Sequence, residues 1–173
     1  KPLIIMTPKS LLRDKHALSP LQDMTTGTRF QKIIVNQHDV SSVTRVILCS
    51  GKIAYDLEDA KAANRHDILI IRLEQLYPFP ENDIREILQP LGHAVFVWCQ
   101  EEPKNMGAWS FVVHELEKIL EDITKNCRLL YAGRKASAAT ATGFHKRHND
   151  EQKELVDKAL GAPPSLSQNN KGT

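Results

Sequence analysis

Apolar runs and helical patterns alternate along the chain from residue 43 onward. The runs are continuous rather than interrupted by polar residues, which is typical of strands buried on both faces. Four such strands are expected, at residues 43–51, 67–76, 93–100 and 127–133. Strands that alternate with helices pair in parallel through right-handed crossovers. The pattern therefore predicts an α/β fold, a doubly wound and mostly parallel sheet with helices on both faces in a three-layer sandwich.

Helices are expected between and after these strands, from apolar residues spaced three and four apart. They lie within residues 52–65, 77–92, 107–123 and 148–161. The inward stripe of the first helix is expected to include Ala60, and that of the third to include Phe111. In the last helix, Asn149 or Asp150 is the expected N-cap, and Gly161 is expected at the C-terminal end.

The first 42 residues follow a different pattern. A short strand is expected at residues 3–6, a helical turn after Pro8, and a second strand at residues 30–35, with a long irregular link between them. A link of this length usually has a function or packs on a partner. We therefore interpret residues 1–42 as the tail of an upstream domain with its connection, residues 43–161 as the α/β domain, and residues 162–173 as a disordered tail.

Composition and charge narrow the class of protein. The chain has 173 residues, 41% hydrophobic and 25% charged, which is enough for one globular domain. The net charge of +2 is too small to indicate a nucleic-acid or membrane surface, so neither partner is expected. The three cysteines form no CxxC or metal-binding pattern and are expected to be buried thiols in a reducing compartment.

The turn after the first parallel strand offers an anion-binding arrangement. Ser50 provides a hydroxyl, Gly51 allows close approach to the backbone, and Lys52 adds a charge at the start of a helix. Arg134 ends a later strand, and strand ends converge, so it could reach the same anion. The alternative is an ordinary strand-to-helix turn with a solvated lysine, and a solvated loop at Arg134.

Two adjacent glutamates end the third strand. Glu101 and Glu102 should point to opposite faces of an extended strand, which makes them a poor acid–base pair. They are expected to accept hydrogen bonds from a basic residue or to meet a partner surface. Trp109, which opens the next helix, is either a core or an interface residue. Nearby, Arg72 and Glu74 share a face and could form an ion pair.

Catalytic motifs are absent from the sequence. The histidines are scattered, and neither HExxH nor GxSxG occurs. The basic run at residues 145–148 is too short, and lacks the interleaved aromatic residues, to indicate nucleic-acid binding. The residues alone therefore predict an α/β domain with a candidate anion site and no evident catalytic machinery.

Several motifs in order resemble one known family. They are "KPLIIMTPKSLLR", "SGKIAYDL", "IRLEQLYPFP", "WCQEEPKNMGAWSF" and "YAGRKASAATATG". Together they resemble the C-terminal part of the E1 component of 2-oxoglutarate dehydrogenase, whose last domain is similar to the transketolase C-terminal domain. The resemblance extends from residue 1 to about residue 161. "AGR" and "TATG" favour this enzyme over its relative that acts on 2-oxoadipate, whereas "EEPKNMG" fits both.

The resemblance implies a fragment of a thiamine-diphosphate- and magnesium-dependent enzyme of the tricarboxylic acid cycle. The full enzyme decarboxylates 2-oxoglutarate and passes the succinyl group to a lipoyl-bearing succinyltransferase, E2. The thiamine-binding GDG signature of the family is absent here, so both cofactors are expected on upstream domains and the fragment is expected to be inactive. The family implies a homodimer, in the bacterial cytoplasm or the mitochondrial matrix.

The resemblance also suggests roles for individual residues. In some members the C-terminal domain receives acetyl-CoA or an acidic metabolite, for which Ser50, Lys52 and Arg134 are the candidates here. Candidates for an interface with upstream domains or with the second subunit are Arg13, Glu101, Glu102 and Trp109. The competing hypothesis is a freestanding module that binds a CoA-like or phosphorylated ligand.

Overall fold

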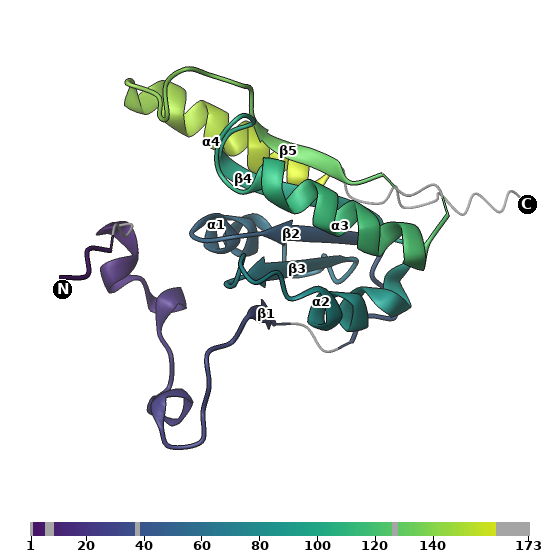
Figure 1. The fold of residues 1–173 in the computed structure, drawn as a ribbon. Coiled ribbons are helices and arrows are strands. Elements are labelled where there is room, and N and C mark those ends of the chain that lie inside the picture. Colours follow the sequence, from purple (N-terminus) through teal and green to yellow (C-terminus); the bar gives the residue numbers. More distant parts are fainter. Residues whose placement is uncertain (1, 6–8, 37–38, 126–127, 162–173) are drawn as a thin grey trace, which may run out of the picture.

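The computed structural model describes residues 2–5, 9–36, 39–125 and 128–161, and Figure 1 shows its fold. The strands are β1 (Ile33–Val35), β2 (Arg45–Cys49), β3 (Ile68–Leu73), β4 (Val95–Pro103) and β5 (Leu130–Arg134). The α-helices are α1 (Ile53–Ala60), α2 (Glu81–Leu88), α3 (Trp109–Ile123) and α4 (His145–Leu160). The predictions for residues 162–173 and for Cys127 lie outside the described residues.

The sheet confirms the predicted fold class. Its strand order among the described residues is β1-β3-β2-β4-β5. The neighbours from β3 to β5 are parallel, and only the edge strand β1 runs antiparallel to its neighbour β3. The chain moves outward from β2 to β3, returns past β2 to β4, and then continues outward to β5. The direction of winding therefore reverses between β2 and β4.

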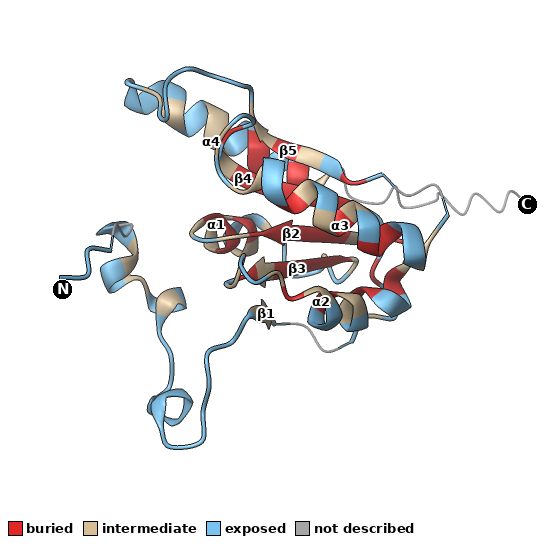
Figure 2. Cartoon of the chain, in the orientation of Figure 1, coloured by how far each residue is buried: buried red, intermediate tan, exposed pale blue. Residues whose placement is uncertain are grey.

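Helices cover both faces of the sheet, as predicted (Figure 1). α1 and α4 share one hydrophobic core with the side chains of one face, among them Ile47 and Val97. α2 and α3 share the second core, which contains Phe96 and Trp98. The central strands are red in Figure 2 because both of their faces are buried. Burial on both faces explains why the strands appear in the sequence as continuous apolar runs.

The strand β4 is longer than expected. It continues through both glutamates to Pro103, with an irregularity in its pairing to β5 between Cys99 and Pro103. The glutamates therefore belong to the strand and do not follow it. Their backbone is held at the carboxyl edge of the sheet, where the neighbouring parallel strands also end.

The helix α3 buries the predicted Leu116, Ile119 and Leu120, but Val112 takes the place expected for Phe111. Phe111 is 41% exposed, whereas Val112 is fully buried together with Leu116. Val112 lies four residues before Leu116, which places both on the same face of the helix. The ring of Phe111 instead packs edge-on against Phe79, with 6.1 Å between the ring centroids.

The helix α4 begins earlier than expected. Phe144 is its N-cap residue and gives no side-chain cap, so Asn149 and Asp150 lie inside the helix and neither caps it. The early turns are held instead by side chains, since Arg147 Nε donates to Glu151 Oε1 one turn later at 2.8 Å. At the other end the predicted Gly161 is confirmed as the C-cap residue.

The helix α1 ends at Ala60, and Ala60 is exposed, so its predicted place on the inward stripe is wrong. The stripe is formed by Ile53, Ala54 and Leu57, which are buried against the sheet. A helix of eight residues is too short for the stripe to extend a further turn.

The N-terminal arm, residues 9–32, leads into β1 and extends away from the sheet (Figure 1). It contains three short 3₁₀ helices, Lys9–Arg13, Lys15–Ala17 and Leu21–Met24, and none of them has a buried residue. The first confirms the predicted helical turn. The predicted strand at residues 3–6 is wrong for residues 3–5, which have no regular structure and pair with none of the described strands. Met6 lies outside the described residues.

Candidate functional site

The carboxyl edge of the parallel strands gathers the predicted site residues. Ser50 and Lys52 follow β2, Glu101 lies near the end of β4, and Arg134 ends β5. The winding reverses between β2 and β4 at this edge, and α/β folds bind ligands outside the carboxyl ends of the strands at such a reversal. Gly51 has a φ of 77°, a conformation that L side chains rarely adopt, so the sharp exit from β2 needs a glycine here.

Lys52 is held by two carboxylates. Its Nζ lies 2.7 Å from Asp56 Oδ2, one turn along α1, and 3.3 Å from Glu101 Oε1 on β4. Burial lowers the pKa of Lys52, but hydrogen bonds and charges from Asp56 and Glu101 outweigh it and raise the pKa above its ordinary value. Lys52 is therefore a permanent cation whose charge is already balanced within the chain.

Gln152 of α4 connects this group to Arg134. Its Nε2 donates to Asp56 Oδ2 at 2.7 Å and to Glu101 Oε1 at 2.9 Å. Its Oε1 accepts from Arg134 Nη2 at 3.2 Å. The expected convergence of the two cations is thus present, but an amide bridges them. Gln152 was not predicted as a site residue, because nothing in the sequence shows which face of α4 meets the strand ends.

Arg134 has further partners on α4. Its Nη2 lies 3.0 Å from His148 Nδ1, and its Nε lies 3.3 Å from Glu151 Oε2. The side chain is only 10% exposed. Like Lys52, Arg134 points into the protein and lies beside a carboxylate of the same chain. The solvated-lysine and solvated-loop alternatives therefore do not describe either residue.

The two glutamates face different surroundings, as their alternation along β4 predicts. Glu101 joins the group around Lys52, whereas Glu102 is exposed and lines a hollow in the surface. That hollow has a volume of about 420 Å³ and lies beside α3. Its lining includes Ser50, Trp98 and Phe111. The carboxylates therefore do not form an acid–base pair.

A buried glutamine beside them fixes the turn that follows. Gln100 is 2% exposed, and its Oε1 accepts from Trp98 Nε1 and from the Trp109 backbone amide, each at 3.0 Å. Its Nε2 donates to the carbonyl oxygens of Pro103 at 3.2 Å and Met106 at 2.8 Å. The polar residue at the end of an apolar run was the sequence signal for this role, and it was missed.

The interface candidates differ in exposure. Arg13 is exposed on the first 3₁₀ helix of the arm. Trp109 is partly buried and packs on Tyr131, with 4.9 Å between the ring centroids. Of the two glutamates, only Glu102 is exposed. Their role in contacts with other domains stays a prediction.

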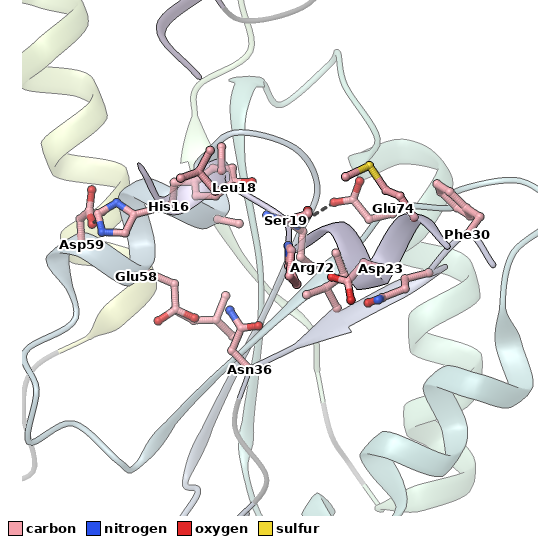
Figure 3. A pocket seen from close by; sticks show the side chains of 18 of the residues that line it. His16, Leu18, Ser19, Asp23, Phe30, Asn36, Glu58, Asp59, Arg72 and Glu74 are labelled. Carbon is pink, nitrogen blue, oxygen red and sulfur yellow. Dashed lines mark ion pairs between the residues drawn. The ribbon is translucent and has the colours of Figure 1, made fainter. Parts of the chain in front are cut away.

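A larger hollow of about 680 Å³ lies between the arm and the sheet edge (Figure 3). The predicted Arg72–Glu74 ion pair is confirmed there, with Nε and Oε1 2.6 Å apart. The Arg72 guanidinium also lies 5.0 Å from the centre of the Tyr55 ring. His16 of the arm reaches Asp59 of α1 at 3.5 Å, and this contact joins the arm to the domain.

The described residues contain neither a metal-binding cluster nor a membrane-spanning helix. No group of three or more histidine, cysteine or acidic side chains is placed to hold a metal ion. No helix in the described ranges has the length and apolar character needed to cross a membrane.

Comparison with known proteins identifies the family. The family model described as 2-oxoglutarate dehydrogenase C-terminal matches residues 18–160. The 2-oxoglutarate dehydrogenase E1 component of Cupriavidus necator is 48% identical over 92% of this chain, that of Haemophilus influenzae 47% over 92%, and that of Rickettsia felis 46% over 93%. The chain spans 17% of the length of each of these relatives. The resemblance seen in the motifs is confirmed, and the chain belongs to the 2-oxoglutarate dehydrogenase C-terminal family.

Proposed function

We propose that this chain is the terminal, non-catalytic domain of a 2-oxoglutarate dehydrogenase E1 component. The carrying observation is that 92–93% of the chain aligns with proteins of that name while covering only 17% of their length. The complete protein would decarboxylate 2-oxoglutarate oxidatively and pass the succinyl group to the lipoyl arm of E2, in the bacterial cytoplasm or the mitochondrial matrix. The relatives described above give no support to a 2-oxoadipate enzyme or to a freestanding module.

The described residues do not fit the cofactors that the complete enzyme uses. A magnesium ion that holds a diphosphate needs carboxylate or carbonyl ligands that are free to coordinate. The acids at the carboxyl edge, Asp56 and Glu101, are instead bonded to Lys52 and Gln152. We therefore place thiamine diphosphate and magnesium on the part of the protein outside this chain.

The exposed apolar side chains of the N-terminal segment support an assembly role. Leu3 and Ile4 are more than 80% exposed, and Leu18 and Leu21 more than 75% exposed (Figure 2). So many exposed apolar side chains on one segment favour a surface that a partner covers. We propose that the upstream domains and the second E1 subunit of a homodimer cover it, with Arg13 at the domain junction and Glu102 at the carboxyl edge.

An effector site is the second candidate function. Ser50, Lys52 and Arg134 lie on one edge, and Gln152 bridges the two cations. An acidic metabolite or acetyl-CoA that bound there would have to displace Glu101 from Lys52. Binding would therefore couple the strand ends to α4, which carries Gln152. The test compares acetyl-CoA affinity in Lys52→Ala and in a control, Lys61→Ala, at the far end of α1. Equal affinities would remove Lys52 from any such site.

Calorimetry tests the non-catalytic role directly. Thiamine diphosphate is titrated with magnesium into the purified chain and, as a positive control, into the complete E1 component of Cupriavidus necator. We expect heat of binding with the complete relative and none with the chain. Tight, magnesium-dependent binding to the chain alone would contradict the proposal.

A further inference from the structure

A separate hollow lies between α4 and the loop that follows β5, away from Lys52. Its volume is about 450 Å³, within the range of small-molecule sites. Four cationic side chains and two carboxylates contribute to its lining, namely Arg134, Lys135, Arg147, Lys158, Glu151 and Glu154. The positive excess indicates an anionic occupant.

Among the residues that line this hollow, two buried polar side-chain atoms lack a hydrogen-bond partner. They are Arg134 Nε and Thr142 Oγ1, and the described residues contain only one other such side-chain atom, Arg72 Nε, elsewhere in the fold. Arg134 Nε lies 3.3 Å from Glu151 Oε2, but the pair lacks hydrogen-bond geometry. Buried polar groups in folded proteins nearly always have partners, so two exceptions in one cavity point to a ligand that supplies them.

The loop that lines the hollow leaves it open to a ligand. It consists mainly of alanine, serine and threonine, and its residues 135–141 are exposed. Asn105 anchors this loop at Ser137. Its Nδ2 donates to the Ser137 carbonyl and its Oδ1 accepts from the Ser137 amide, each at 3.0 Å. Small side chains leave room above α4, and the hydroxyls of Ser137, Thr140 and Thr142 are additional donors in the lining.

The start of α4 adds to the positive potential. Lys146 and Arg147 lie in its first turn, which contains no acidic residue. Cations are unfavourable there, because the N-terminal end of a helix is itself positive. A bound anion would relieve this repulsion.

We propose that this hollow binds the phosphate group of a small ligand, free or as a phosphate ester. Arg134 and Thr142 donate to phosphate oxygens, and Arg147 and Lys158 supply the remaining charge. Phosphate suits the site because it accepts several hydrogen bonds at once and pairs well with a guanidinium fork. The inference rests on the proposed effector function only in that both sites use Arg134. It places the ligand beside α4 rather than at Lys52.

The test is an NMR titration of the whole chain with inorganic phosphate, at constant ionic strength set by chloride. We expect saturable shifts of the amide signals of residues 135–142. Lys158→Gln and Thr142→Val should each weaken binding about tenfold, the loss expected for one strong contact. Lys153→Gln, an exposed lysine of the same helix outside the hollow, should leave affinity within about twofold of the wild type.

Two further arms complete the test. Ribose 5-phosphate is titrated in parallel, and tighter binding than inorganic phosphate identifies an ester as the ligand class, whereas equal binding identifies phosphate itself. Lys52→Gln can act only indirectly, through Glu101 and Gln152, and should weaken both affinities less than Lys158→Gln does. The proposal is overturned if the shifts do not saturate, or if Lys158→Gln and Lys153→Gln bind equally. It is also overturned if Lys52→Gln weakens binding as much as Lys158→Gln, which would favour the strand-tip effector site instead.

Discussion

Replacing Gln100 with leucine should destabilise the domain by far more than the loss of one hydrogen bond would. The change keeps the volume nearly constant but removes every hydrogen bond that the amide makes. Trp98 Nε1 and the Trp109 amide lose their acceptor, and the Met106 carbonyl loses its donor, whereas the Pro103 carbonyl keeps a hydrogen bond from the Met106 amide at 2.8 Å. Leucine offers neither a donor nor an acceptor, so the turn from β4 to α3 loses the side chain that links its backbone to Trp98.

The magnitude follows from the number of groups left unpaired. A buried donor or acceptor without a partner costs about 1–3 kcal/mol. Trp98 is fully buried and bears the full cost, whereas Met106 is only partly buried and its carbonyl bears less. We expect Gln100→Leu to lower the free energy of unfolding by about 3–4 kcal/mol, summed from these unpaired groups.

The assay is urea unfolding of the whole chain, followed by far-UV circular dichroism. With a slope of about 2 kcal/mol per molar urea, the midpoint should fall by about 1.5–2 M. Gln75→Leu is the matched control, since Gln75 makes one exposed hydrogen bond, to the Pro78 carbonyl at 2.7 Å. Its loss should cost about 1 kcal/mol or less. If the two variants unfold at the same midpoint, the hydrogen bonds of Gln100 do not hold the turn and the reasoning is wrong.

Three further predictions concern other parts of the domain. Hydrogen bonds from Arg65 lower the pKa of Asp67 in the folded chain, so the stability they add is present above about pH 4 and is lost as the pH falls through the folded-state pKa. Asp67→Asn should therefore lower the free energy of unfolding by about 1–2 kcal/mol near neutral pH. Urea unfolding across pH should show that the difference between the variant and the wild type vanishes in acid. Burial raises the pKa of Cys99 to about 12 and that of Cys49 well above its usual range. Mass spectrometry after iodoacetamide treatment should therefore find both thiols unmodified in the native chain and modified in urea. Rapid modification of either thiol in the native chain would contradict their burial. Thr142→Val removes an unpaired buried hydroxyl and should leave stability unchanged or raise it by up to about 1 kcal/mol in phosphate-free buffer, whereas a clear loss would reveal a partner for that hydroxyl.

The sheet was predictable from the sequence because its central strands are buried on both faces. A strand such as β2 is apolar at nearly every position, whereas a helix on the surface of a sheet is apolar along one stripe only. Helix limits were less predictable because they depend on side-chain contacts. Asn149 and Asp150 are good caps by type, but the ion pair of Arg147 with Glu151 accompanies an earlier start of α4.

The candidate site was predictable only in its location. Strand ends converge in any parallel sheet, so Lys52 and Arg134 were expected near one another. Their partners depend on the rotation of α4 about its axis, which decides that Gln152 and Glu151 face the strands. Periodicity indicates the apolar face of a helix, but not which polar residue beside that face meets a neighbouring strand end.

The central claim is that this chain serves as the terminal domain of a larger E1 component. The most direct measurement exchanges the matching C-terminal segment of the Cupriavidus necator E1 component for this chain and follows oxidative decarboxylation of 2-oxoglutarate in the chimera. The account predicts activity in the chimera, and none in the same relative truncated before that segment or in this chain alone. A folded chimera without activity, or turnover of 2-oxoglutarate by the isolated chain, would contradict it.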